Sequence, residues 1–185
     1  MNLLDLWLPI LLSAVAVFFV SFLLHMVLKY HRSDIASVPN EDAAMDAVRT
    51  WNLPPGQYMF PHGGGPEAMK DPAFIKKFET GPVAHFTVYP QSKLTMTPQL
   101  IRWFIFTVVV SLFAAYIAAR AVGPGAEYLE VFRFAGATAF FCYAVADWQN
   151  TIWWGRKVST TVKNTIDGLI YALVTAGIFG WLWPN

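Results

Sequence analysis

The strongest constraint on the fold of this chain is the way in which four apolar stretches divide its basic residues. The stretches cover residues 3–28, 101–121, 131–154 and 166–183. A helix of about 20 apolar residues crosses the hydrocarbon core of a bilayer, and each stretch is close to that length or longer. The sequence therefore predicts an all-α membrane protein with four transmembrane helices.

The positions of Lys and Arg orient these helices. Of the 13 Lys and Arg residues, Arg120 and Arg133 fall on one side of the implied membrane and the remaining 11 fall on the other. The larger set consists of Lys29, Arg32, Arg49, Lys70, Lys76, Lys77, Lys93, Arg102, Arg156, Lys157 and Lys163. Because cytoplasmic loops carry the excess of Lys and Arg, we expect both termini to lie outside and the basic side to be cytoplasmic.

These observations give a domain layout. We expect transmembrane helices over residues 1–28, 101–121, 131–154 and 166–184, arranged in two antiparallel pairs. The first stretch follows an acid and precedes two bases, which is typical of an anchor and not of a cleaved signal peptide. Residues 29–100, between the first two helices, form the only polar segment of useful size.

The segment 29–100 reads as a small cytoplasmic α+β insertion. A helix is predicted to begin after Asn40, and a second one at Pro72 with Asp71 as its cap. Residues 57–60 and 83–89 have the composition of strands that can pair around the second helix. A domain of this size is marginally stable alone, so we expect it to rest on membrane lipid, on the spans or on a partner.

A few polar side chains lie near the cytoplasmic ends of the predicted spans, namely His25, Asp147, Asn150 and Asp167. Ionisable residues inside a membrane are costly and usually face a partner or a water-filled cavity. Asp147 can pair with His25 or with a basic loop residue and so fix the bundle, or it can serve a proton or cation relay. Asp167 is expected in the first turn of its helix, where the helix dipole stabilises a carboxylate.

The last span carries a stripe of small residues on one face: Gly168, Ala172, Ala176 and Gly180. Such a stripe allows two helix backbones to approach closely in lipid, where packing drives association. Two interpretations stay open, because the stripe can pack inside the monomer or can form the interface with a second copy or another membrane subunit.

Composition and motifs exclude several classes of function. The acids interspersed among the bases of residues 29–100 argue against nucleic-acid binding. No catalytic or nucleotide-binding pattern is present, and the Gly63-Gly64-Gly65 run lacks the residues of a phosphate loop. We therefore expect no catalytic residues and no cofactor. His62 and His85 are weak candidates for metal ligands, since they would approach each other only if the two strands pair.

The chain also resembles a family of small four-span bacterial inner-membrane proteins that has no known activity. The resemblance rests on Pro55-Gly56-Gln57-Tyr58, Pro61-His62, Gly81-Pro82-Val83 and the terminal run from Gly177 to Pro184, and extends over the whole chain. It implies a bacterial inner membrane and the same four-span layout.

Our leading hypothesis is a non-enzymatic accessory or scaffold protein of a homo-oligomer or of a larger membrane complex, for example a respiratory or photosynthetic one. Its recognition surface would lie on the cytoplasmic side. The alternative is a small oligomeric transporter or channel with Asp147 and His25 at its inner mouth. A metal or redox protein that uses His62 and His85 is a third reading.

Overall fold

The computed structural model describes residues 1–185, which are mostly helical with one small sheet. The chain divides into two compact units. The helical unit contains residues 1–36 and 95–185, and the small unit contains residues 37–94. The small unit is shorter than the segment 29–100 expected from the sequence. Residues 29–36 and 95–100, at the two ends of that segment, belong to the helical unit.

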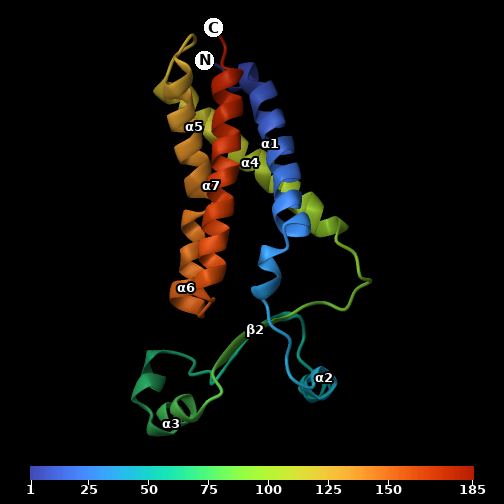
Figure 1. Ribbon diagram of the computed structural model, residues 1–185. Coiled ribbons are helices and arrows are strands. Elements are labelled where there is room, and N and C mark those ends of the chain that lie inside the picture. The colour runs from blue at the N-terminus through green and yellow to red at the C-terminus, as the bar shows by residue number, and fades with distance from the viewer. The chain divides into compact units, whose positions relative to one another are not determined.

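Four long helices build the helical unit: α1 (Trp7–Phe22), α4 (Thr97–Ala121), α5 (Tyr128–Tyr143) and α7 (Val158–Trp181). Helix α1 contacts α4 and α7, and α5 contacts the same two helices, so the four form a ring of contacts (Figure 1). A 3-10 turn, Leu3–Leu6, precedes α1, and a π-helical turn, Leu23–Val27, continues it.

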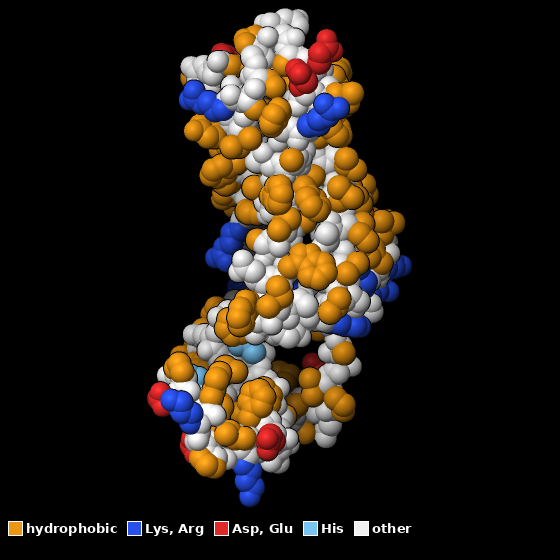
Figure 2. Space-filling model, turned by 90° about the vertical axis from the view of Figure 1, so that its left-hand side faces the viewer, with side chains coloured by type: hydrophobic (Ala, Val, Ile, Leu, Met, Phe, Trp, Pro, Cys, Tyr) orange, Lys and Arg blue, Asp and Glu red, His pale blue; other side chains and the backbone are white.

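Three of these helical stretches are long and apolar enough to cross a membrane: Leu3–Val27, Thr97–Ala121 and Tyr128–Trp154. Helix α7 is of similar length, but its first part carries Lys163, Asn164 and Asp167. In Figure 2, hydrophobic side chains form a broad band over the helical unit, between two zones that contain Lys and Arg. The three apolar helices and the band are compatible with a membrane protein.

Small side chains fill the centre of the helical unit. Near the end where both termini lie, which we call the terminal end, Ala114, Ala118 and Ala135 are fully buried together with Leu6 and Phe179. Small residues let helix backbones approach closely, which gives the dispersion contacts that hold helices together in lipid. The core at this end is thus tight and apolar.

The third and fourth predicted segments differ from the observed helices. The segment 131–154 is not one continuous helix, because α5 ends at Tyr143 and a 3-10 turn, Val145–Asp147, separates it from α6 (Trp148–Trp154). Helix α7 begins at Val158, eight residues before the expected start at residue 166. Its first turns contain neither Gly nor Pro, so the weak helix propensity of the Val, Thr, Ser and Asn residues in 158–165 does not stop the helix from beginning there.

The small unit contains α2 (Glu41–Thr50), α3 (Pro72–Thr80) and two strands, β1 (Gly56–Phe60) and β2 (Ala84–Val88). The predicted pairing of the strands is confirmed: they are antiparallel, with Gly56 opposite Val88 and Phe60 opposite Ala84. A 3-10 turn, Pro66–Lys70, precedes α3. The Asp71 side chain caps α3 by accepting a hydrogen bond from the Ala73 amide, as expected.

Aromatic side chains hold the small sheet together. Phe86 on β2 packs against Tyr58 and Phe60 on β1 and against Trp51. Even so, no residue between 37 and 94 is buried. The small unit therefore has an aromatic cluster but no solvent-free core.

Candidate functional site

Both histidines of the helical unit and most of its other ionisable residues lie at the end opposite the termini, where α1 ends and α7 begins. We call this the polar end. The segment after α1 shapes it, because the π-helical turn Leu23–Val27 is followed by Lys29 in the left-handed region (φ 57°) and then by a 3-10 turn, Tyr30–Ser33. π-helical turns are rare and frequently occur at functional sites. This backbone path brings Tyr30 and His31 to α7.

Asp167 on α7 is the centre of a cluster of side chains. It is only 2% exposed, and its Oδ1 accepts a hydrogen bond from the hydroxyl of Tyr30. Its Oδ2 lies 2.8 Å from His31 Nε2 and 3.8 Å from His25 Nε2. The two imidazole rings are stacked, with centroids 4.3 Å apart and planes within 4° of parallel. We refer to His25, His31 and Asp167 as the histidine cluster.

Asp34 contacts the histidine cluster on the side of His31 that faces away from Asp167, and Lys163 contacts Asp34. Asp34 Oδ2 lies 2.6 Å from His31 Nδ1, and Asp34 Oδ1 accepts a hydrogen bond of 2.6 Å from Lys163 Nζ. Lys163 also donates to the carbonyl of Tyr30 and to the hydroxyl of Ser33. Burial alone raises the pKa of Asp34, but the hydrogen bonds from Lys163 and His31 outweigh it and hold that pKa below its ordinary value.

Asp147 forms a separate network. Its Oδ1 accepts hydrogen bonds from Asn150 (2.9 Å) and Arg156 (2.5 Å), and its Oδ2 accepts one from Asn164 (2.8 Å). Three donors, one of them the Arg156 cation, thus satisfy the carboxylate. The network connects three parts of the helical unit: helix α6 with the 3-10 turn before it, which together with α5 we call the α5–α6 arm; the short loop that follows α6; and helix α7.

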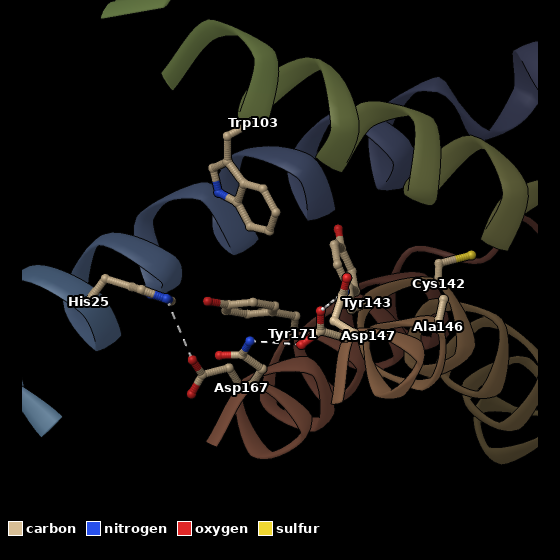
Figure 3. Close-up of a pocket in the computed structure, with 10 residues that line it drawn as sticks. His25, Trp103, Cys142, Tyr143, Ala146, Asp147, Asp167 and Tyr171 are labelled. Atoms are coloured by element: carbon tan, nitrogen blue, oxygen red, sulfur yellow. Dashed lines mark hydrogen bonds and ion pairs between the residues drawn. The ribbon is translucent and has the colours of Figure 1, made fainter. Parts of the chain in front are cut away.

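A pocket of about 410 Å³ lies between these two networks. Figure 3 shows His25 pointing from the α1 side toward Asp167, with Tyr143 and Tyr171 between Trp103 and the carboxylates. The hydroxyls of Tyr143 and Tyr171 are buried and have no hydrogen-bond partner. Buried polar atoms are nearly always paired, so two such hydroxyls beside a polar pocket mark a place for water or a polar ligand.

The four polar residues singled out from the sequence all line this pocket, namely His25, Asp147, Asn150 and Asp167. Of the two partners expected for Asp147, the structure pairs it with a basic loop residue, Arg156, and not with His25, which lies beside Asp167. Asp167 does not lie in the first turn of its helix either, since α7 begins nine residues earlier. The helix dipole acts within the first turn, so the hydrogen bond from the Tyr30 hydroxyl, and not the dipole, stabilises this carboxylate.

Sequence reasoning missed several residues of the site. Tyr30, His31 and Asp34 fall in the predicted cytoplasmic segment 29–100 and Lys163 in the connection before the last predicted span, and none of them was a candidate site residue. A signal was present, since Tyr30 to Asp34 places an aromatic hydroxyl, an imidazole and a carboxylate within five residues of the end of a span. Polar groups at that depth usually find partners on a neighbouring helix.

The small-residue stripe of α7 packs inside the chain. A Cβ atom on Gly168 would lie 2.7 Å from the Cβ of Ala144, just after α5, and one on Gly180 would lie 2.7 Å from the ring of Tyr128. Ala176 is fully buried and Ala172 nearly so, and Ala176 faces Gly136 on α5. This face of α7 is therefore occupied by α5 and is not open to a second copy.

The remaining candidates lie elsewhere. His85 is opposite Met59 in the sheet, and His62 follows β1 beside Pro61 and Gly63. No third metal-ligating side chain joins them, and the one group of three such side chains is the histidine cluster, whose ligand atoms all lie within 4.8 Å of one another. Cys142 lines the pocket, and its thiol points away from the carboxylates in Figure 3.

Comparisons with protein-family models, with curated proteins and with solved structures found no match to this chain.

Proposed function

We propose that this protein is a non-enzymatic accessory or scaffold subunit of a membrane assembly, either a homo-oligomer or a larger complex such as a respiratory or photosynthetic one. The observation that carries the proposal is the incomplete packing of the small unit, in which no residue is buried. A folded unit with so little interior gains stability when it packs on another surface.

Exposed apolar side chains of the small unit support this role. On and beside α3, Met69 is 76% exposed, Phe78 is 50% exposed and Ile75 is 38% exposed. They line a shallow pocket together with Phe74 and Glu79. Clustered apolar side chains of this kind are typical of interaction surfaces.

The packing at the terminal end of the helical unit favours a scaffold role over a role as a pore. Its core consists of alanines with Leu6, Ile10, Val131 and Phe179, and none of these side chains can carry an ion or a proton. The polar pocket is confined to the opposite end. A path through the bilayer within one chain would require polar groups along the whole bundle.

We further propose that the chain crosses a bacterial inner membrane four times, with both termini outside and the small unit in the cytoplasm. Helix α7 packs against α1 and α5, which are both apolar enough to span, and its 24 residues reach about 36 Å. The excess of Lys and Arg on the side of the small unit supports the orientation.

Cysteine labelling tests this topology. After Cys142→Ser removes the native thiol, single cysteines replace Asn2 or Lys93, and intact bacterial cells are treated with a membrane-impermeant maleimide. The Asn2→Cys protein should react and the Lys93→Cys protein should react only after lysis. The reverse pattern would overturn the orientation, and labelling of both in intact cells would exclude the membrane arrangement.

Native mass spectrometry tests the scaffold role. The protein is extracted from its own membrane in mild detergent, and its mass should be that of an oligomer or of a complex with other subunits. A matched variant, Ile75→Ser with Phe78→Ser, should lose these partners while the helical unit keeps its thermal transition. A lone monomer, for both proteins, would contradict the proposal.

A small oligomeric transporter is the second candidate, because His25 and Asp147 line one pocket beside two unpartnered tyrosine hydroxyls. Flux of protons and cations into liposomes discriminates the two proposals. If the protein transports, Asp147→Asn should lower the flux at least tenfold. Absent flux in the native protein, or equal flux in both, would remove this candidate.

A further inference from the structure

The histidine cluster brings three metal-ligating atoms together: Nε2 of His25, Nε2 of His31 and Oδ2 of Asp167. These atoms come from three elements, the π-helical turn, the 3-10 turn after it and α7. The side chain of Asp167 is 3% exposed, that of His31 is 13% exposed and that of His25 is 48% exposed. One ligand is thus deeply buried while another remains accessible from outside.

The hydrogen bonds of the two rings direct both Nε2 lone pairs into the cluster. His25 Nδ1 lies 3.1 Å from the carbonyl oxygen of Ser21, which can only accept, so Nδ1 carries the hydrogen. His31 Nδ1 lies 2.6 Å from a carboxylate oxygen of Asp34, and its Nε2 lies 2.8 Å from one of Asp167, so the neutral ring donates to one carboxylate and the protonated ring to both. In the neutral tautomer that donates to Asp34, both Nε2 atoms are bare and face the Asp167 carboxylate. Added protons or a bound cation would relieve the repulsion among these lone pairs.

The surroundings resemble the second shell of a metal site. A ligating histidine typically donates its other ring nitrogen to a carboxylate or a carbonyl, and here His31 contacts Asp34 and His25 contacts the Ser21 carbonyl. The Tyr30 hydroxyl occupies Oδ1 of Asp167 and leaves Oδ2 for the cluster. With neutral rings, Asp34, Asp167 and Lys163 sum to a single negative charge, which favours a cation.

The distances between the three ligand atoms are also close to those of a tetrahedral zinc site. Bonds of about 2.0–2.1 Å in a tetrahedral zinc site place neighbouring ligand atoms roughly 3.3 Å apart. Oδ2 of Asp167 lies 2.8 Å from one Nε2 atom and 3.8 Å from the other, which brackets that value. The two Nε2 atoms lie within 4.8 Å of each other, and the stacked rings must tilt for their in-plane lone pairs to meet at one ion.

We propose that His25, His31 and Asp167 form a binding site for one divalent transition-metal ion of the zinc class. Imidazole with a single carboxylate suits such ions, whereas calcium and magnesium prefer sites made of oxygen ligands. Three protein ligands leave a fourth position open toward the pocket that His25 and Asp167 line, where water or a polar ligand completes the coordination.

Zinc titration of the full chain in detergent tests the proposal. After chelator treatment and dialysis, the protein should bind one zinc ion per chain by calorimetry and elemental analysis. Cobalt in place of zinc should give the visible absorption of a tetrahedral site. His25→Gln should weaken zinc binding at least tenfold, and Asp34→Asn should weaken it about tenfold through His31.

The other two histidines provide matched controls, since His62→Gln and His85→Gln make the same change in the small unit. Both should bind zinc as the native chain does. His25→Gln removes a half-exposed side chain, and an unchanged thermal transition would show that its zinc defect is local. Less than one zinc ion per chain, or equal zinc affinity in the native and His25→Gln proteins, would overturn the site. Loss of zinc in the two control variants would also overturn it.

Discussion

The helical unit and the small unit differ in how their residues are removed from solvent. In the helical unit, alanines and the hydroxyl residues Ser13, Ser111, Thr107 and Thr175 are fully buried together with larger side chains such as Phe179, Leu6 and Val17. In the small unit, aromatic rings shield one sheet and nothing is buried. The comparison shows that the helical unit has a solvent-free interior of its own, whereas the small unit has only a partly shielded aromatic cluster.

The interior of the helical unit should be the less tolerant of added volume. Gly168→Ala places a Cβ 2.7 Å from the Ala144 side chain and 3.2 Å from its backbone, so neither helix can yield cheaply. Overpacking typically costs about 1–3 kcal/mol, which should exceed the gain of about 1 kcal/mol in helix propensity. We expect a net loss of stability of up to about 2 kcal/mol, measured by thermal unfolding in detergent.

Gly177→Ala is the matched control on the same helix. Its Cβ would meet only the Tyr128 hydroxyl, at 3.7 Å, which is ordinary contact. The same gain in helix propensity should leave this variant neutral or slightly more stable. Equal destabilisation of both variants would show that the close approach at Ala144 is not what sets the stability.

Removal of one aromatic ring should destabilise the sheet of the small unit and leave the helical unit unchanged. Phe86→Ala removes the ring that contacts Trp51, Tyr58 and Phe60. Because the ring is only partly shielded, we expect a loss of about 1 kcal/mol, well below that of a fully buried phenylalanine. Hydrogen exchange should accelerate in β1 and β2 alone. Acceleration throughout α4 and α7 would mean that the two units unfold together.

A single hydrogen bond between α1 and α4 should contribute less to the stability of the helical unit than its close packing does. Trp103 Nε1 on α4 donates to the Ser21 hydroxyl on α1 over 2.8 Å. Trp103→Phe keeps an aromatic ring and removes the donor, so we expect a loss of about 0.6 kcal/mol, the average for such bonds in membrane proteins. Ser21→Ala should lower the free energy of unfolding by a similar amount. The double variant should be little less stable than either single variant. Full additivity of the two changes would show that the bond contributes nothing.

The smallest effect should come from a surface ion pair of the small unit. Arg49 pairs with Asp46 one turn away on α2, and both side chains are more than 60% exposed. Exposed pairs contribute only about 0–1 kcal/mol, so Arg49→Gln should change the stability of the small unit by less than about 0.5 kcal/mol. Hydrogen exchange of α2 measures this directly. A larger change would indicate that α2 has more support than its exposure suggests.

The sequence allowed the helices and the polar residues to be found, but not the pairing of those residues. Apolar length and basic loops are properties of local segments, so α1, α4 and the α5–α6 arm were predictable. Which carboxylate meets which histidine depends on where α7 begins and how each helix is rotated. Because α7 begins eight residues early, Asp167 lies deep in a helix, where it meets His31 and not solvent.

The π-helical turn at the end of α1 has a consequence for how this segment can change. The Leu28 amide bonds to the carbonyl of Leu23, five residues back, so the turn holds one residue more than an α-helical turn. Each residue of an α-helix advances the chain by about 100°, and a deletion within Leu23–Val27 would rotate everything after it by that amount. His31 would then point away from Asp167. This stretch can therefore accept substitutions at its exposed positions, but its length is fixed.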